Sequence, residues 1–318
     1  MRIPITDAEA GARLDKLLVQ KVPGLGRAGA KRLFAEGRVR VFPGGEGRGR
    51  KADKGDIATA ADVIEIDLDA AAHGTAAVAD PDTPLDVVLE TPHVIVIDKP
   101  AGQPTAPLDP GERGTVANAL LARYPEIAGI GFSPREPGLC HRLDTGTSGL
   151  VLAARTKSAF ETLTLALKEG RLDKRYLVIC AAKDLPETGT IDIPLAPHPK
   201  DRRRVYPCVH PRDVARYAPR PATTTYTKLR EQGDWALVEV KAPKAARHQI
   251  RAHFAAIEHP LVGDTLYGGP PLPGQQEGDK ARHALHAHHI TWKGDAEVPA
   301  FTVESPLPND LATLLGEG

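Results

Sequence analysis

The densest group of residues that could perform chemistry lies at 141–150, where the sequence reads HRLDTGTSGL. Asp144 is followed by Gly146 and Gly149 and precedes the apolar run 150–154. Glycines permit a tight turn, so we expect a loop that presents this carboxylate at the start of a strand. An ionised carboxylate in such a loop could serve as a nucleophile or as a base. The alternative is that Asp144 only caps a turn.

Two classes of hydrolase share part of this pattern. Aspartic proteases use Asp-Thr-Gly, but their chemistry needs two carboxylates that share a proton, and this chain has no second Asp-Thr-Gly or Asp-Ser-Gly. A protease would therefore require a homodimer. A glycoside hydrolase would need a carboxylate pair such as Asp98 and Asp144. Neither class explains why the chain has two strongly basic segments.

These basic segments are hidden in a net charge of zero, with 41 Lys and Arg residues against 41 acids. Residues 1–56 hold thirteen basic and seven acidic residues, whereas residues 198–220 hold seven basic and two acidic ones, interleaved with Tyr206 and Tyr217. Each segment alone could be a solvated basic surface. Two such segments in a neutral chain favour an anionic polymer as the partner.

The length of 318 residues and the hydrophobic content of 41% indicate a globular chain of about two domains. No apolar run reaches the roughly 18 residues that span a bilayer, and the N-terminus lacks the apolar stretch of a signal peptide. Cys140, Cys180 and Cys208 form no CxxC pair, which indicates free thiols in a reducing compartment. We therefore expect a cytoplasmic protein without a membrane partner.

The first part of the chain has the pattern of a small α/β module. Hydrophobic spacing predicts helices at 11–22 and 28–36 and short strands around 39–41 and 63–66, which gives a module at residues 1–67. Residues 57–97 contain eight acids and no Lys or Arg, with an Ala-rich stretch among them. We expect an acidic, Ala-rich linker at 68–82.

The second part, residues 83–310, has the pattern of a larger α+β domain. Its strands are not separated by regular helices, which predicts a mixed, mainly antiparallel sheet. Alternation along 174–180 places Tyr176, Val178 and Cys180 on one face of a strand. Ser158 and Glu161 predict a capping box at the start of one helix. Strands are predicted at 93–98, 150–154, 174–180, 223–229 and 236–241, and helices at 116–124, from 158 to before Gly170, and at 248–257.

Taken with three other segments, HRLDTGTSGL resembles the catalytic loop of the RluA family of RNA pseudouridine synthases. The others follow in the family's order: VIDKPAG at 96–102, KRYLVIC at 174–180 and HQIRAHFAAIEHPLVGDTLYGG at 248–269. The later segment 285–287 fits the family's closing segment, and residues 1–67 resemble the S-four RNA-binding module that precedes many members. The resemblance covers about residues 11–305, and four ordered motifs are far more specific than one.

The resemblance implies an activity, a fold and three catalytic residues. The activity is isomerisation of uridine within RNA: the base is detached from its sugar at nitrogen, turned and rejoined through carbon, without any cofactor. The fold is a catalytic domain of pseudouridine-synthase type after an RNA-binding module. Asp144 is implied as the essential carboxylate and Arg251 as the cation that pairs with it. Tyr176 is implied as the ring that packs on the target base and assists proton transfer.

The RNA-binding module also suggests the substrate, because it is typical of members that modify large-subunit ribosomal RNA; transfer RNA is the alternative. Base chemistry inside folded RNA requires extrusion of the base, and Arg142 is our candidate for filling the vacated space. We expect a monomer. Further RNA contacts are expected from His141, Arg247, Arg27, Lys31, Arg32, Arg203 and Arg204.

One segment departs from the family pattern, which usually has Gly-Arg-x before His-Gln-Ile-Arg. Here Ala245-Ala246-Arg247 stands at that place. Arg247 lies four residues before Arg251, so we expect both on one face of a helix. The rival function is a non-catalytic RNA-binding or ribosome-assembly protein. That function explains the basic segments but leaves the set Asp144, Tyr176 and Arg251 without a purpose.

Two weaker patterns could hold a ligand. G-x-G-x-x-G at 24–29 is typical of dinucleotide binding only between a strand and a helix; here it follows a helical segment, which predicts a turn between two helices. Four histidines lie close together, but no Cys or HExxH pattern accompanies them, so we expect structural or RNA-facing roles and no metal. They are His283, His286, His288 and His289.

Overall fold

The computed structural model describes residues 1–22, 25, 27–67, 76–109, 111–272, 275 and 282–316, without the side chains of Arg27 and Ala28. The chain forms two compact units, Met1–Ala76 and Ala77–Gly318. The expected turn at 24–29 and most of the expected linker at 68–82 fall on residues outside this description. Within that linker range, Ala77 and Asp80 are buried, and Asp80 accepts hydrogen bonds from Thr83 and the Gly114 amide. The packed part of the second unit therefore begins at Ala77.

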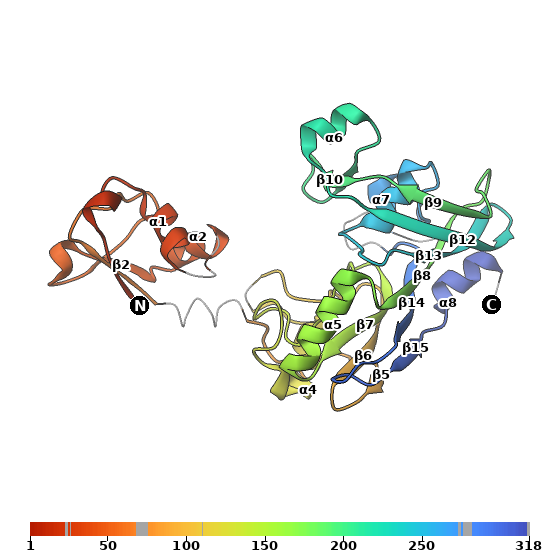
Figure 1. Ribbon diagram of the computed structural model, residues 1–318, viewed down its shortest axis with the longest axis horizontal. Coiled ribbons are helices and arrows are strands. Elements are labelled where there is room, and N and C mark those ends of the chain that lie inside the picture. Colours follow the sequence, from red (N-terminus) through yellow and green to blue (C-terminus); the bar gives the residue numbers. More distant parts are fainter. Residues whose placement is uncertain are drawn as a thin grey trace. The chain divides into compact units, whose positions relative to one another are not determined.

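The first unit is a four-stranded antiparallel sheet with two helices (Figure 1). Its apolar residues alternate along the strands and recur at helical spacing, and together they form one core that includes Leu14, Leu18, Leu33 and Ile64. The strand order is β1-β4-β2-β3. The elements are β1 (Arg2–Pro4), α1 (Leu14–Lys21), α2 (Arg27–Ala35), β2 (Val39–Phe42), β3 (Arg50–Lys51) and β4 (Val63–Ile66).

The second unit is built on a nine-stranded sheet in which every pair is antiparallel except β7 with β14, so the predicted mixed, mainly antiparallel α+β domain is confirmed. Its order is β5-β6-β7-β14-β8-β13-β12-β9, with β15 on β14. The strands are β5 (Val87–Glu90), β6 (Val94–Lys99), β7 (Ser148–Ala154), β8 (Asp173–Ala181), β9 (Thr188–Asp192), β12 (Thr223–Gln232), β13 (Trp235–Lys241), β14 (Leu285–Trp292) and β15 (Phe301–Glu304).

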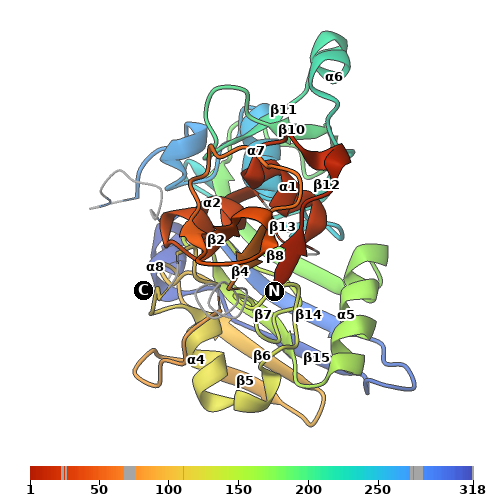
Figure 2. The same ribbon diagram turned by 90° about the vertical axis from the view of Figure 1, so that its left-hand side faces the viewer.

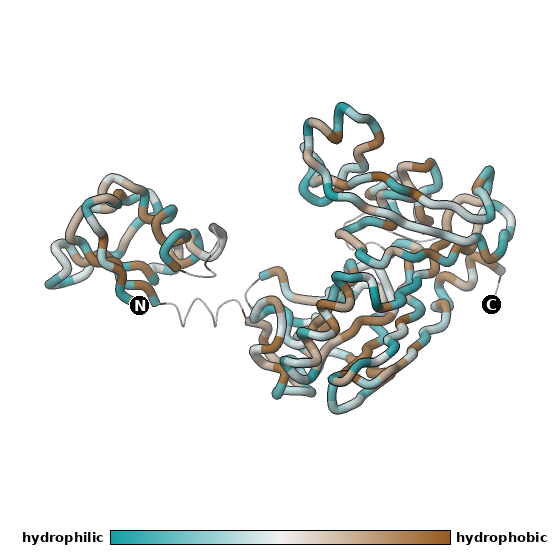
Figure 3. The backbone as a smooth tube through the Cα atoms, in the orientation of Figure 1, coloured by the Kyte–Doolittle hydropathy of each residue, from teal (hydrophilic) through white to brown (hydrophobic). Residues whose placement is uncertain are grey.

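Helices cover both faces of this sheet. The helices are α4 (Val116–Arg123), α5 (Lys157–Glu169), α6 (Pro211–Tyr217), α7 (Gln249–Ala256) and α8 (Asn309–Ala312), and α6 follows a small hairpin of β10 (Leu195–Pro197) and β11 (Val205–Pro207). Figures 1 and 2 show α5 alongside β7 and β14, and Leu163 of α5 belongs to one hydrophobic cluster with Leu152 and Trp292. Hydrophobic residues are concentrated along the central strands (Figure 3).

Helices α5 and α7 share one face of the sheet. The α7 residue Phe254 belongs to the same cluster as Tyr176 and Ala287. A bulge in β14 between Ala287 and His289 shifts its pairing with β8 by one residue. After the bulge, Ile290 lies opposite Lys174, which is two residues before Tyr176 in β8. Ile290 belongs to the cluster that packs under α5. Since side chains two apart in a strand share a face, Tyr176 and Lys174 both lie on the α5 and α7 side. The confirmed set of Tyr176, Val178 and Cys180 thus faces α7.

The start of α5 corrects one sequence prediction. The helix begins at Lys157, and Thr156 is its N-cap, with its hydroxyl accepting a hydrogen bond from the Ala159 amide at 3.1 Å. The expected capping box of Ser158 and Glu161 is wrong because Ser158 already lies in the first turn, where its hydroxyl donates to Glu297. The three cysteines are free thiols, as predicted, and the structure shows that all three are buried.

Gly149 lies where the Asp144 loop joins the sheet at the start of β7. Its φ is +107°, and an added Cβ would lie 2.6 Å from the Ala287 amide nitrogen and nearer still to its carbonyl oxygen. We expect Gly149→Ala to lower the free energy of unfolding by about 3 kcal/mol, measured by denaturant titration. Gly233→Ala, at φ +59° but with open space around it, is the control and should cost only about 1 kcal/mol. Equal losses in the two variants would contradict this account.

Candidate active site

The site is centred on Asp144, which lies in the loop before β7, and on Arg251 of α7. The Arg251 Nη1 atom donates to Asp144 Oδ2 at 3.0 Å. His248 Nε2 lies 3.7 Å from the same oxygen. The Asp144 side chain is 27% exposed, whereas that of Arg251 is only 6% exposed. The carboxylate is therefore open to a substrate, and its cation is held behind it.

Arg251 is held by a second carboxylate, that of Asp264. Its Nε donates to Asp264 Oδ2 at 2.7 Å, and its Nη2 donates to Oδ1 at 2.8 Å. This bidentate pair fixes the plane of the guanidinium, which also lies 5.2 Å from the centre of the Tyr267 ring. The Tyr267 hydroxyl is 3.1 Å from His248 Nδ1. Two carboxylates around one cation give the group a net negative charge.

The electrostatics keep Asp144 ionised. Burial alone would raise the pKa of Asp144, but the charges of His248 and Arg251 hold it below its usual value. Burial also lowers the pKa of His248 to about 4, so this imidazole is neutral at pH 7 and Arg251 is the permanent cation. Because Asp144 has a lowered pKa, its contribution to stability is present above pH 4 and is lost as the pH falls through that lowered pKa.

The backbone of the Asp144 loop is held by side chains from several elements. Lys99 Nζ at the end of β6 donates to the Thr145 carbonyl at 3.3 Å, and Arg282 Nη1 donates to the Gly146 carbonyl at 3.1 Å. His283 bonds the Thr147 hydroxyl at 2.8 Å. Such contacts fix the position of the carboxylate before any substrate binds.

Lys99 is a fully buried cation, and it gives a testable pH dependence. Its ammonium also donates to the carbonyls of Pro100 and Gln103, both at 2.9 Å. Burial, with the charge of Arg282, lowers the pKa of Lys99 to about 7. In the unfolded chain its pKa is about 10.4. Between these values the unfolded state binds more protons, so the stability that depends on Lys99 rises with pH.

We therefore expect the difference in unfolding free energy between wild type and Lys99→Met to shift in favour of wild type by roughly 1 to 2 kcal/mol from pH 6.5 to pH 9. Denaturant titrations at the two pH values measure this shift. Exposed Lys183→Met is the control, and its difference from wild type should stay constant. A constant difference for Lys99→Met as well would contradict the lowered pKa.

Tyr176 lies on β8, buried at 5% exposure in the cluster that α7 covers. Leu143, the neighbour of Asp144, packs on the same cluster. The strand partner of Tyr176 is Ala287, which also pairs with Gly149 at the start of β7. Among the described residues, the Tyr176 hydroxyl has no hydrogen-bond partner. The ring and the Asp144 loop thus border the same region of the sheet.

Of the expected RNA contacts near Asp144, Arg142 points outward. Its side chain is 62% exposed, and Nη1 donates to Glu136 Oε1 at 2.7 Å. His141 is used inside the fold, where its Nε2 accepts from the Leu152 amide at 3.2 Å. Burial and the charge of Lys174 lower the pKa of His141 to about 3.

Arg247 corrects a second prediction. The helix begins at Gln249, after His248 in the left-handed conformation at φ +54°, so Arg247 precedes α7 and does not share a helical face with Arg251. Its guanidinium instead donates to the carbonyls of Arg202 and Arg203 at 3.0 and 2.8 Å. Through Arg247, the altered segment 245–247 therefore forms hydrogen bonds with the basic segment 198–220 next to the site.

The other basic residues predicted to bind RNA differ in exposure. Arg203 is 60% exposed and pairs with Asp201, whereas the Arg204 guanidinium lies 5.4 Å from the centre of the Tyr267 ring. In the first unit, Lys31 is exposed on α2. Arg32 lies 3.8 Å from Glu36 one turn later. The side chain of Arg27 is outside the described part of the chain.

Sequence reasoning missed several residues of this site, namely Lys99, His248, Asp264, Tyr267 and Arg282. All but Arg282 lie inside the segments VIDKPAG and HQIRAHFAAIEHPLVGDTLYGG. Their only signal was membership of those segments, because a buried Lys or Asp has no distinctive spacing. Asp98, considered as a second catalytic carboxylate, instead accepts a hydrogen bond from Ser305.

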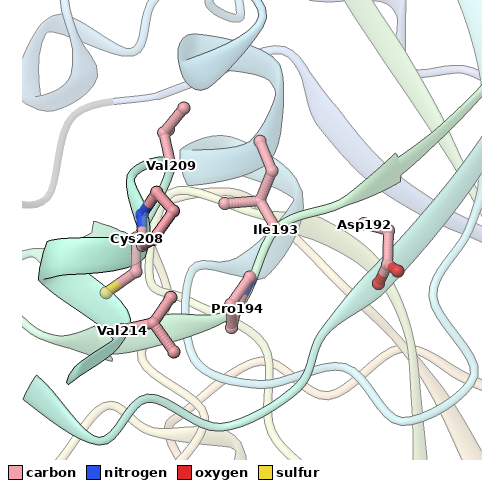
Figure 4. A pocket seen from close by; sticks show the side chains of 7 residues that line it. Asp192, Ile193, Pro194, Cys208, Val209 and Val214 are labelled. Atoms are coloured by element: carbon pink, nitrogen blue, oxygen red, sulfur yellow. The ribbon is translucent and has the colours of Figure 1, made fainter.

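An apolar cavity of about 390 Å³ lies beside α6, away from these residues (Figure 4). Its lining includes Ile193, Pro194, Val209 and Val214 and no residue of the Asp144 group.

Among the described residues, no group of His, Cys, Asp or Glu side chains has the geometry of a metal site. His283 and His286 are buried and bonded to Thr147 and Ser148. In the described part of the chain, no helix is long and apolar enough to cross a bilayer.

Comparison with known proteins supplies the family. Residues 93–256 match the family model described as RNA pseudouridylate synthase. A relative from Chloroflexus aurantiacus, an uncharacterised RNA pseudouridine synthase, is 36% identical over 98% of this chain and 92% of its own. Ribosomal large subunit pseudouridine synthase D from Yersinia pestis is 31% identical over 98% of this chain and 92% of its own.

A solved structure gives the fold. Human RNA pseudouridylate synthase domain containing 4 covers 73% of this chain and 92% of its own with a TM-score of 0.55 and 21% identity. The fold and the sequence comparisons together define an enzyme that modifies RNA. The chain belongs to the RNA pseudouridine synthases, within the RluA family that its motifs resemble.

Proposed function

We propose that this enzyme converts specific uridines of large-subunit ribosomal RNA to pseudouridine, with Asp144 as the essential carboxylate. Relatives named ribosomal large subunit pseudouridine synthase D match nearly the whole chain, including the basic first unit. The observation that carries the mechanism is the hydrogen bond of Arg251 to Asp144, backed by the bidentate pair with Asp264. Transfer RNA is the alternative substrate.

The role of Asp144 follows from its ionisation. The reaction breaks the bond from the ribose carbon to the base nitrogen and forms a bond from the same carbon to a ring carbon of the base. That ring carbon loses its proton, and the ring nitrogen gains one. An ionised carboxylate can attack the sugar or accept a proton from it, and Arg251 keeps Asp144 in that form.

The target base must leave its stack to reach Asp144, which costs a few kcal/mol. We assign Tyr176 as the ring that packs against the extruded base and assists proton transfer, because it borders the region in front of the Asp144 loop and its hydroxyl has no partner in the described part of the chain. Exposed Lys31 and Arg203 are assigned to backbone contacts.

Arg142 is assigned to the space that the base vacates. Its exposed guanidinium can stack on bases once it leaves Glu136. We expect Arg142→Ala to lower kcat/KM on a structured RNA about ten-fold and on an unpaired oligonucleotide less than two-fold, because only the structured RNA must be opened. Glu136→Gln is the control that releases Arg142 without removing it. Equal losses on the two RNAs would exclude this role.

The test of the substrate is pseudouridine mapping of total RNA from cells that lack this protein, complemented with wild type or with Asp144→Asn. We expect sites in large-subunit ribosomal RNA to disappear and only wild type to restore them. Loss of sites in transfer RNA alone would assign the alternative substrate. Restoration by Asp144→Asn would refute the role of this carboxylate.

A further inference from the structure

A second cavity of the catalytic unit, of about 610 Å³, is lined by positive charge. Its lining residues lie where α5 ends, where β8 begins, and where β13 and β14 end. Four cationic side chains line it, with Asp173 as the one acid among the lining residues; they are Arg171, Lys174, Lys241 and Lys293. The Asp144 group lines no part of this cavity.

Lys174 is the observation that points to a ligand. It is 8% exposed, and no described residue forms a hydrogen bond or ion pair with its ammonium. This ammonium lines a cavity that an anion could enter, and an anion there would give it a charged partner. The cavity keeps a positive charge after its ion pairs are counted. Arg171 pairs with Glu169 at 2.6 Å and Lys241 lies 3.7 Å from Asp173, which leaves the charges of Lys174 and Lys293.

The position of the cavity relates it to the catalytic loop. Lys174 and Tyr176 share one face of β8 and are two residues apart, which is about 7 Å along a strand. The charge of Lys174 acts on His141, three residues before Asp144. Trp292 adds an apolar wall, over which the Arg171 guanidinium lies at 5.4 Å from the ring centre. A single RNA strand that presents a base to Asp144 could reach this cavity.

We propose that this cavity binds a backbone phosphate of the RNA substrate next to the target nucleotide, with Lys174 as its central cation. The ligand is a phosphodiester because the site offers ammonium and guanidinium donors and little that could read a base edge. This proposal rests on the proposed function, since it assigns how the same RNA is held. A phosphate held in this cavity would fix the position of the RNA strand along the face of the sheet that carries Tyr176.

The test begins with Lys241 and Lys293, because both side chains are accessible to solvent, whereas Lys174 is only 8% exposed. Lys241→Ala/Lys293→Ala in the full chain should raise KM for in vitro transcribed large-subunit ribosomal RNA about five-fold, with kcat changed less than two-fold. The slope of log Kd against log salt, measured by filter binding, should fall in magnitude by about 1. Lys174→Met, checked for an unchanged Tm, should also raise KM without lowering kcat.

The matched control is Lys157→Ala/Lys183→Ala, which removes the same charge from two exposed lysines outside the cavity. It should leave KM within two-fold and the salt slope unchanged. Equal effects of the two pairs would overturn the proposal, because net charge alone would then explain binding. An unchanged Kd and slope in the cavity variants would also overturn it. If wild type forms no pseudouridine in this RNA, the proposed substrate fails, while the binding measurements still decide the cavity.

Discussion

Asp144→Asn is expected to lower the rate of pseudouridine formation by about 10³-fold or more while leaving RNA affinity and the fold intact. Asn cannot attack the sugar and cannot accept a proton at neutral pH, so the chemical step loses its reactive group. The fold should survive because Arg251 keeps its bidentate pair with Asp264 after the change. A buried cation that retains a carboxylate avoids the penalty of an unpaired charge.

Single-turnover kinetics on a uridine-containing RNA measure the rate, and filter binding with thermal unfolding measures affinity and stability. Asp234→Asn is the matched control, because Asp234 is exposed in the turn between β12 and β13. That control should keep the wild-type rate. A loss of less than ten-fold in Asp144→Asn, with the fold unchanged, would remove Asp144 from the chemistry.

Arg251→Met is expected to damage both activity and stability. It removes the guanidinium that pairs with both Asp144 and Asp264, and leaving a buried charge uncompensated costs about 3 to 5 kcal/mol. Without Arg251, less positive charge opposes the effect of burial, so the pKa of Asp144 should rise. Asp144 also loses the hydrogen bond that positions its carboxylate, so kcat/KM should fall about 10²-fold at neutral pH, and protonation should add to the loss at acidic pH.

The sign of the pH dependence distinguishes this electrostatic role from a packing role. In the variant, the acidic limb of the kcat/KM profile should move to higher pH, and part of the activity should return as the pH rises. Its stability deficit should be largest above pH 7 and should shrink as the pH falls and Asp144 is protonated. Arg251→Lys keeps the positive charge but loses the bidentate geometry of the guanidinium. This variant should show an intermediate loss of kcat/KM and a smaller shift of the acidic limb. A pH-independent deficit would favour packing alone.

Most elements of both units could be predicted from the sequence because their signals are local. Alternation along β8 and helical spacing along α1 depend only on which side chains must be buried, and both follow from backbone periodicity. The capping of α5 failed because Thr156 and Ser158 are both good caps, and the choice depends on where the chain leaves β7.

The sequence by itself determined the family and indicated Asp144, Tyr176 and Arg251 as the candidate catalytic residues, since motif order and residue type carry that information. Only the tertiary structure decided what holds them: Asp264 behind Arg251, Lys99 and Arg282 on the loop backbone, and Arg247 on the basic segment. These partners lie up to 136 residues apart in the chain. Their pairing arises from desolvation, because a buried charge or carbonyl must find a partner wherever the fold brings one.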